Sequence, residues 1–140
     1  MLTFIIDAPE ELASTAASIL KSCTDSKIFT FSGNLGAGKT TLIRYLCREL
    51  GYMDDVTSPT YALINEYQTE KGQIYHMDLY RVKNAEEALD FGIEEYLFSG
   101  NYCFIEWPEV IGEILDMDIY TVAIHVNEDG NRKIEVMKVP

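Results

Sequence analysis

The sequence predicts a single α/β domain over residues 1–140, with a mixed, mostly parallel sheet, helices on both faces and β-hairpins. Three observations predict it. A β-branched and aromatic run, 27–31, precedes a glycine-rich turn and then apolar residues at helical spacing. A second apolar run, 101–107, is bounded by turn residues, as a buried strand is. Two pairs of strand-like runs, within 62–80 and 119–139, are each joined by a turn that contains glycine.

Size and charge narrow the class of protein. With 140 residues, of which 47% are hydrophobic, the chain suits one globular domain, and no apolar run approaches a membrane span. Cys23, Cys47 and Cys103 are odd in number and widely spaced, which argues against disulfides or zinc and favours a reducing cytoplasm. A net charge of −12 makes direct binding of nucleic acid unfavourable, because contacts to phosphates need clustered Lys and Arg.

The first helix is expected to start at Asp7, as cap, with Pro9 in its first turn. Apolar residues then recur on one face. The glycine-rich turn that follows fits the phosphate-binding loop (P-loop) pattern G-x-x-x-x-G-K-[ST] from Gly33 to Thr40. Its backbone N–H groups and the next helix N-terminus favour phosphate. Lys39 can reach the β- and γ-phosphates, and the Thr40 hydroxyl can hold Mg²⁺. The predicted nucleotide-binding residues of the loop are Gly33, Asn34, Leu35, Gly36, Ala37, Gly38, Lys39, Thr40 and Thr41.

Residues 57–61 form a hydroxyl-rich loop, and residue types alone favour a simple turn there. The strand-like run 73–80 has period two, which places His76, Asp78 and Tyr80 on one face. Two interpretations stay open for that face. Spacing alone favours a solvated surface. Alternatively, Asp78 faces the γ-phosphate and positions water or metal.

A capping box at Asn84 predicts a short helix before the next strand. That strand, 101–107, carries Glu106 at its carboxyl end, where P-loop folds place the acid that acts on Mg²⁺. The alternative is a strand-ending glutamate in solvent. Residues 108–115 are predicted to be helical, and a last hairpin follows.

Four motifs are now assembled: G-N-L-G-A-G-K-T-T at 33–41, T-S-P-T-Y at 57–61, H-M-D-L-Y-R at 76–81 and I-E-W-P at 105–108. In this order they resemble the TsaE family, small bacterial P-loop ATPases needed for threonylcarbamoyladenosine modification of tRNA. The last three motifs are much more specific than the P-loop. The resemblance covers nearly the whole chain and implies a P-loop NTPase-like fold.

The resemblance also implies residue roles. Thr40 and Glu106 would bind Mg²⁺ beside ATP, and residues 57–60 would act as a switch-like loop near the γ-phosphate. The candidate catalytic residues are Asp78, Thr60, His76 and Glu106, of which Asp78 is the most important. Tyr80 and Arg81 would line the catalytic side. Trp107 would lie beside the nucleotide, and Arg132 is a further candidate for the adenine pocket.

Members of the family act with the partner proteins TsaD and TsaB, and their ATP hydrolysis serves turnover of that complex. The partners would hold most of the tRNA, in agreement with the acidic composition. Two alternatives stay open. A small-molecule kinase usually needs a basic lid, and no Arg-rich lid is visible. A nucleotide-dependent regulatory subunit without hydrolysis is disfavoured by the presence of Thr40, Asp78 and Glu106.

Overall fold

The computed structural model describes residues 1–34, 36–59 and 62–140. The roles predicted for Leu35 and Thr60 therefore fall outside the described residues, as does Tyr61. The strands are β1 (Leu2–Ile6), β2 (Ile28–Ser32), β3 (Ile64–Thr69), β4 (Gly72–Asp78), β5 (Tyr102–Glu106), β6 (Ile119–Val126) and β7 (Arg132–Val139). The α-helices are α1 (Leu12–Ser22), α2 (Lys39–Glu49), α3 (Ala85–Asp90) and α4 (Ile93–Leu97), with short 3₁₀ helices η1 (Pro9–Glu11) and η2 (Pro108–Ile111).

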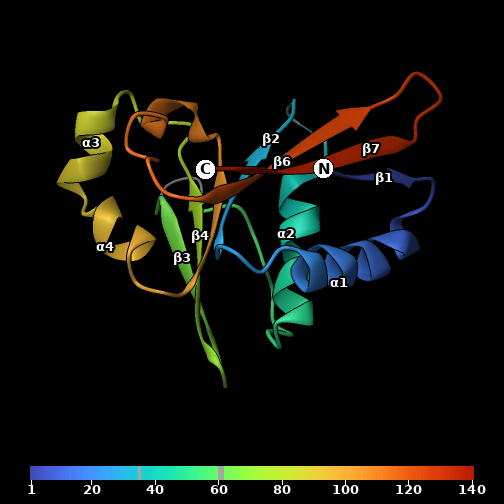
Figure 1. Cartoon of the computed structure of the whole chain (residues 1–140), viewed down its shortest axis with the longest axis horizontal. Coiled ribbons are helices and arrows are strands. Elements are labelled where there is room, and N and C mark those ends of the chain that lie inside the picture. Colours follow the sequence, from blue (N-terminus) through green and yellow to red (C-terminus); the bar gives the residue numbers. More distant parts are fainter. Residues whose placement is uncertain (35, 60–61) are drawn as a thin grey trace.

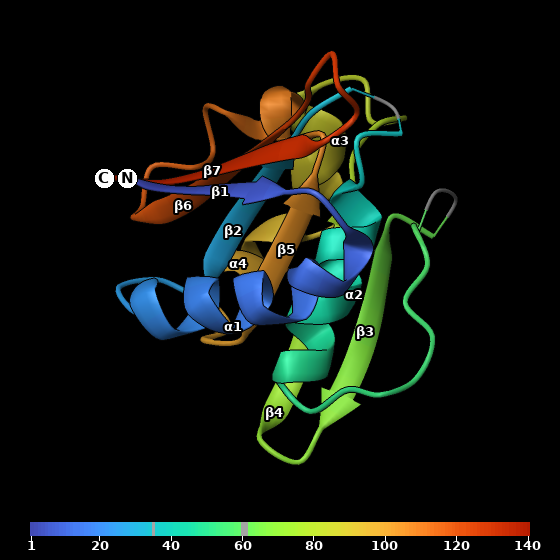
Figure 2. The same cartoon turned by 90° about the vertical axis from the view of Figure 1, so that its right-hand side faces the viewer.

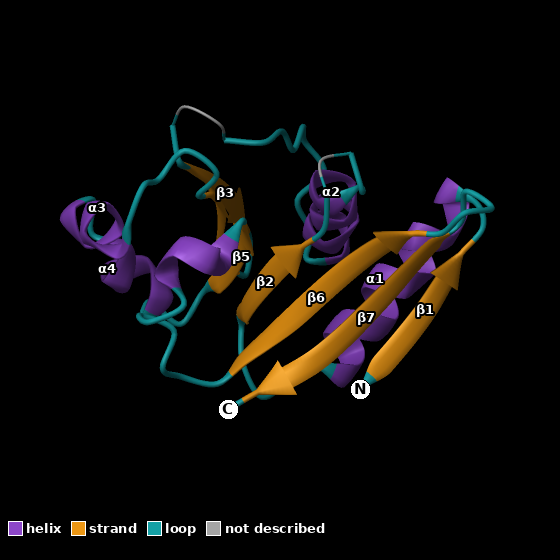
Figure 3. Ribbon diagram, turned by 90° about the horizontal axis from the view of Figure 1, so that it is seen from above, coloured by secondary structure: helices purple, strands orange, loops and turns teal. Residues whose placement is uncertain are grey.

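All the described strands belong to one mixed sheet, in the order β1-β7-β6-β2-β5-β4-β3. The four central strands, β6, β2, β5 and β4, run parallel to one another. The outer strands pair antiparallel through the β3–β4 and β6–β7 hairpins and the β1–β7 pairing. Figure 3 shows this sheet from above. The mixed α/β prediction with hairpins is confirmed.

Helices cover both faces of the sheet (Figure 1). On one face, α1 and α2 pack into a core cluster that includes Phe29, Phe31 and Phe104. On the other face, α3, α4 and η2 pack into a second cluster with Ile28 and Ile105. Consecutive residues of β2 and β5 are thus buried on opposite faces, which explains why apolar residues dominate both faces of these parallel strands.

Two local expectations about helices were wrong. The cap of the first helix is Ala8, whose N–H donates to the Glu11 side chain at 3.2 Å, while Asp7 instead accepts from Asn131. Residues 108–115 form only the 3₁₀ helix η2 and looser turns. Gly112 at its end is a poor helix former. Among the described residues, no helix combines the length and the apolar character that crossing a membrane requires.

Candidate active site

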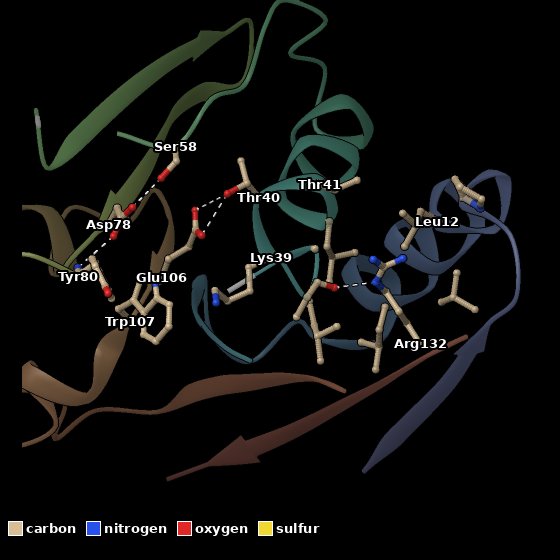
Figure 4. A pocket seen from close by; sticks show the side chains of 18 of the residues that line it. Leu12, Lys39, Thr40, Thr41, Ser58, Asp78, Tyr80, Glu106, Trp107 and Arg132 are labelled. Carbon is tan, nitrogen blue, oxygen red and sulfur yellow. Dashed lines mark hydrogen bonds between the residues drawn. The ribbon is translucent and has the colours of Figure 1, made fainter. Parts of the chain in front are cut away.

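A pocket of about 720 Å³ opens at the carboxyl ends of the parallel strands β2, β4 and β5, against the N-terminus of α2. Its volume suits a small-molecule ligand, and strand ends of this kind are the usual ligand site of α/β sheets. Figure 4 shows its interior. The polar and aromatic side chains at one end belong to Lys39, Thr40, Ser58, Asp78, Glu106 and Trp107.

The P-loop connects β2 to α2 and needs its glycines for geometric reasons. Gly38, the N-cap of α2, has φ 105°, a left-handed conformation that strains other residues. A Cβ at Gly33 would lie 2.8 Å from the carbonyl oxygen of Ile124 on β6. The loop therefore packs tightly against the sheet, with the free N–H groups of α2 directed at the pocket.

Lys39 begins α2, and its side chain is only 5% exposed. Its Nζ donates to the carbonyl oxygens of Gly33 at 2.6 Å and Asn34 at 3.4 Å, and it lies 4.0 Å from the centre of the Trp107 ring. Burial lowers the pKa of the ammonium, and the carboxylates of Glu106 and other nearby acids oppose that shift. The Lys39 ammonium is thus held by two carbonyl oxygens of the P-loop and by the ring of Trp107.

Glu106 ends β5 and is 3% exposed, so the alternative of a solvated glutamate is wrong. The Thr40 hydroxyl donates to its carboxylate, with the two oxygens 3.1 and 3.0 Å away (Figure 4). His76, which does not line the pocket, lies with its Nε2 2.6 Å from Oε2 of Glu106. These contacts compensate a buried carboxylate that would otherwise be costly.

Asp78 ends β4, and the parallel register pairs it directly with Glu106. Its carboxylate accepts from the Ser58 hydroxyl at 2.5 Å and from the Tyr80 N–H at 3.0 Å. Asp78 is 6% exposed and His76 is fully buried, so the interpretation of this face as a solvated surface is wrong. The reason is tertiary, because helix α2 and the loop at Ser58 cover that side of the hairpin.

The Trp107 backbone is left-handed, with φ 56° and ψ 59°. This conformation costs a non-glycine residue roughly 1–2 kcal/mol, and here it directs the indole toward Lys39. The ring also contacts Tyr80, with centroids 4.9 Å apart. Tyr80 leaves the strand after Asp78 and is 56% exposed, so it does not share the burial of His76 and Asp78, with which the alternation grouped it.

The pocket continues past the P-loop into an apolar end that sequence reasoning missed. Ile6, Leu12 and Ile134 line it. Arg132 also lines the pocket and donates from Nε to the Ala37 carbonyl at 2.8 Å, which brings a residue from the last hairpin to the P-loop. Arg132 is a candidate for the adenine pocket from the sequence, but its contact with the P-loop depends on pairing β1 and β6 with β7, which no local pattern predicts.

Most of the described residues that the sequence analysis selected are brought together here. Gly36 to Thr41, Asp78, Glu106, Trp107 and Arg132 line the pocket, while Gly33 and Asn34 hold Lys39 from the loop. Arg81 also lines it. His76 is not among the lining residues, since it lies behind Glu106.

Comparison with known proteins places these features in a family. The model of the family described as "Threonylcarbamoyl adenosine biosynthesis protein TsaE" matches residues 6–134. The TsaE protein of Haemophilus influenzae is 40% identical over 87% of this chain and 77% of its own. The TsaE protein of Rickettsia felis is 35% identical over 95% of this chain and 78% of its own. The crystal structure of Bacillus subtilis YdiB superposes with a TM-score of 0.80 at 28% identity, covering 99% of this chain and 84% of that one. The chain therefore belongs to the TsaE family of threonylcarbamoyl adenosine biosynthesis proteins.

Proposed function

We propose that this protein is a Mg²⁺-dependent ATPase that supports formation of threonylcarbamoyladenosine in tRNA, as an accessory subunit acting with TsaD and TsaB. One observation carries the ATPase part of the proposal. Lys39, Thr40, Asp78 and Glu106 come from three separate elements, yet they surround one pocket at the N-terminus of α2. This set supplies an anion site, oxygen ligands and a second carboxylate, which are the groups that phosphoryl transfer uses.

Phosphate binding would use the N-terminus of α2. The left-handed Gly38 leaves the first N–H groups of the helix facing the pocket, and the helix dipole favours an anion there. The Lys39 ammonium, now bonded to the carbonyl oxygens of Gly33 and Asn34, would exchange these for β- and γ-phosphate oxygens. A phosphate chain in this place would also offset the cost of the buried cation.

The residues beside Lys39 fit a magnesium ion. Thr40 Oγ1 and both carboxylate oxygens of Glu106 lie within 3.1 Å of one another at the pocket wall, and Mg²⁺ prefers oxygen ligands. No cluster of three His, Cys, Asp or Glu side chains suited to a metal occurs among the described residues, and a nucleotide-bound Mg²⁺ needs none, because phosphates and water complete its shell. When bound, the ion would neutralise charge that develops on the β- and γ-phosphates.

Asp78 would orient the attacking water. Its place beside Glu106 in the parallel register puts a second carboxylate at the same strand ends. Both of its oxygens accept hydrogen bonds, from the Ser58 hydroxyl and from the Tyr80 N–H. Water orientation therefore requires that the loop carrying Ser58 give up its bond, which makes that loop suited to gate hydrolysis.

The apolar end of the pocket would take the adenine. Ile6, Leu12 and Ile134 offer a surface for a flat base, and the guanidinium of Arg132 is held beside them by its bond to Ala37. The phosphate site and this end belong to one continuous pocket, as a nucleotide requires. The place of Arg132 beside this end supports its proposed role in the adenine pocket.

Partner dependence is supported by two observations. The chain carries a net charge of −12, so tRNA would be held mainly by TsaD and TsaB. In addition, the bond from Ser58 occupies Asp78, and docking of a partner on this loop would release it. We therefore expect slow hydrolysis by the isolated protein and faster hydrolysis in the complex.

The test is steady-state phosphate release from Mg²⁺-ATP, measured for the protein alone and with purified TsaD and TsaB. Acceleration by the partners, lost in the Asp78→Asn variant, supports the proposal. High turnover that the partners leave unchanged would refute partner gating. ADP release that depends on an added small-molecule acceptor would instead identify a kinase.

A further inference from the structure

Tyr67 is a buried residue of the edge strand β3 that does not line the pocket. It is 4% exposed. Its ring stacks on Tyr52 with centroids 4.6 Å apart, and its hydroxyl lies 2.9 Å from Nδ1 of His76. The hydroxyl therefore contacts the imidazole that supports Glu106.

Both ring nitrogens of His76 have a partner: Nε2 lies 2.6 Å from Oε2 of Glu106, and Nδ1 lies 2.9 Å from the Tyr67 hydroxyl. We assign the tautomer from these partners, because a carboxylate oxygen accepts: Nε2 is the donor to Glu106, and Nδ1 accepts the hydroxyl proton of Tyr67. Burial raises the pKa of Tyr67 to about 12, so this phenol keeps its proton at neutral pH.

Glu106 is consequently held from two sides. The Thr40 hydroxyl donates from the pocket, and the Tyr67–His76 pair donates from the interior of the domain. Removing the Tyr67 hydroxyl would leave Nδ1 of His76 without its donor in a fully buried position. The imidazole could then rotate or change tautomer, and either change would release Oε2 of Glu106.

The same hydroxyl lies near the loop that carries Ser58. Asn65, two residues before Tyr67, donates from Nδ2 to the Thr57 carbonyl at 3.0 Å, and the Tyr67 hydroxyl lies 3.4 Å from that carbonyl. Figure 2 shows this segment passing alongside β3. A single hydroxyl proton serves one acceptor at a time, and the shorter distance favours His76 over the carbonyl of Thr57.

We infer that Tyr67, acting through His76, is a positioning residue that sets the orientation of the Glu106 carboxylate toward Thr40 and the metal. The part of this inference that concerns the metal ion rests on the proposed function. It gives His76 a supporting role behind a metal ligand, where partners of this kind fix the orientation of ligands. It also connects the loop before Ser58 to the metal ligand through one aromatic side chain.

The first experiment needs neither nucleotide nor metal. Urea unfolding is measured for Tyr67→Phe, Glu106→Gln and the double variant. Both Tyr67 and Glu106 bond to the imidazole of His76, so the shifts in unfolding free energy should be non-additive. Tyr52→Phe is the matched control, because it removes a hydroxyl from the same aromatic stack, whereas the hydroxyl that contacts His76 belongs to Tyr67. Its shift should add to that of Glu106→Gln. Additive shifts for Tyr67→Phe as well would overturn the inference.

The second experiment measures ATP affinity by calorimetry, with Mg²⁺ and with EDTA. Replacing the partner of a metal ligand typically weakens metal binding by roughly 10- to 100-fold, so Tyr67→Phe should weaken Mg²⁺-ATP binding by about tenfold and leave binding in EDTA nearly unchanged. Tyr52→Phe should change neither. An equal loss in both conditions would show that Tyr67 only supports the fold. Wild-type protein that binds no ATP would refute the proposed function, and the unfolding cycle would still decide the positioning role.

Discussion

Replacing Asp78 with asparagine is expected to separate catalysis from binding and stability. The carboxylate accepts from the Ser58 hydroxyl at 2.5 Å and the Tyr80 N–H at 3.0 Å. The asparagine carbonyl can keep the bond from Tyr80, and the Ser58 hydroxyl can rotate to accept from the new amide. Charge-assisted bonds contribute roughly 1.5–3 kcal/mol and neutral ones about 0.5–1.5 kcal/mol, so the free energy of unfolding should fall by about 1 kcal/mol.

Hydrolysis should fall much further. A positioned acid–base side chain contributes typically about 10²–10⁴ in rate, so we expect single-turnover ATP hydrolysis to drop by at least about 100-fold, or about 2.7 kcal/mol of barrier. The Kd for Mg²⁺-ATP should change by no more than about threefold, because the shape of the side chain is kept. Ser58→Ala is the control, since it removes the partner of Asp78 but keeps the charge, and hydrolysis by this variant should equal or exceed that of the wild type.

The assay is rapid-quench measurement of one turnover, with calorimetry for binding and urea unfolding for stability. A loss of stability and of ATP affinity that matches the loss of hydrolysis would refute the reasoning. In that case Asp78 would serve to tie β4 to the loop at Ser58 rather than to orient water.

Three further predictions concern the P-loop, the metal ligand and the buried thiols. Lys39→Ala should abolish productive use of ATP, because the cation at the β- and γ-phosphates is removed; unchanged ATP affinity and hydrolysis would exclude the P-loop assignment. Glu106→Ala should weaken ATP binding in Mg²⁺ and leave it nearly intact in EDTA; calorimetry that shows equal losses would make Glu106 structural. Burial raises the pKa values of Cys47 and Cys103 to about 12, from an ordinary 9.0. Their stabilisation is therefore fully present below about pH 9 and is lost as the pH rises toward 12, by about 1.4 kcal/mol per unit for each thiol. In urea unfolding between about pH 9 and 10.5, the unfolding free energy of Cys47→Ala should fall less steeply with pH than that of the wild type. Equal slopes for the two proteins would contradict a raised pKa for Cys47.

The order of strands and helices was largely predictable, since each element follows from a local pattern. The run 28–31 is rich in β-branched and aromatic residues, and the glycines after it have the spacing that a phosphate loop needs. The capping box at Asn84 is also local, and its side chain accepts from the Glu87 N–H at 3.0 Å. Where local signals competed, the prediction failed. The cap of the first helix is Ala8 rather than Asp7, with the Glu11 side chain accepting the Ala8 N–H, and Asp7 accepts from Asn131 on the last hairpin.

The sequence by itself indicated the residues of the proposed chemistry: the glycine-rich loop with Lys39 and Thr40, Glu106 at the end of a strand and Asp78 on one face of a strand-like run. Only the tertiary structure decided how they meet. The parallel register of β4 and β5 sets Asp78 beside Glu106, and the packing of α2 turns a face that alternation assigned to solvent into a buried one. The pairing of β7 with β1 and β6 brings Arg132 to the P-loop. The physical reason is that side-chain period and turn chemistry act over a few residues, whereas register and burial depend on contacts between segments far apart in the chain.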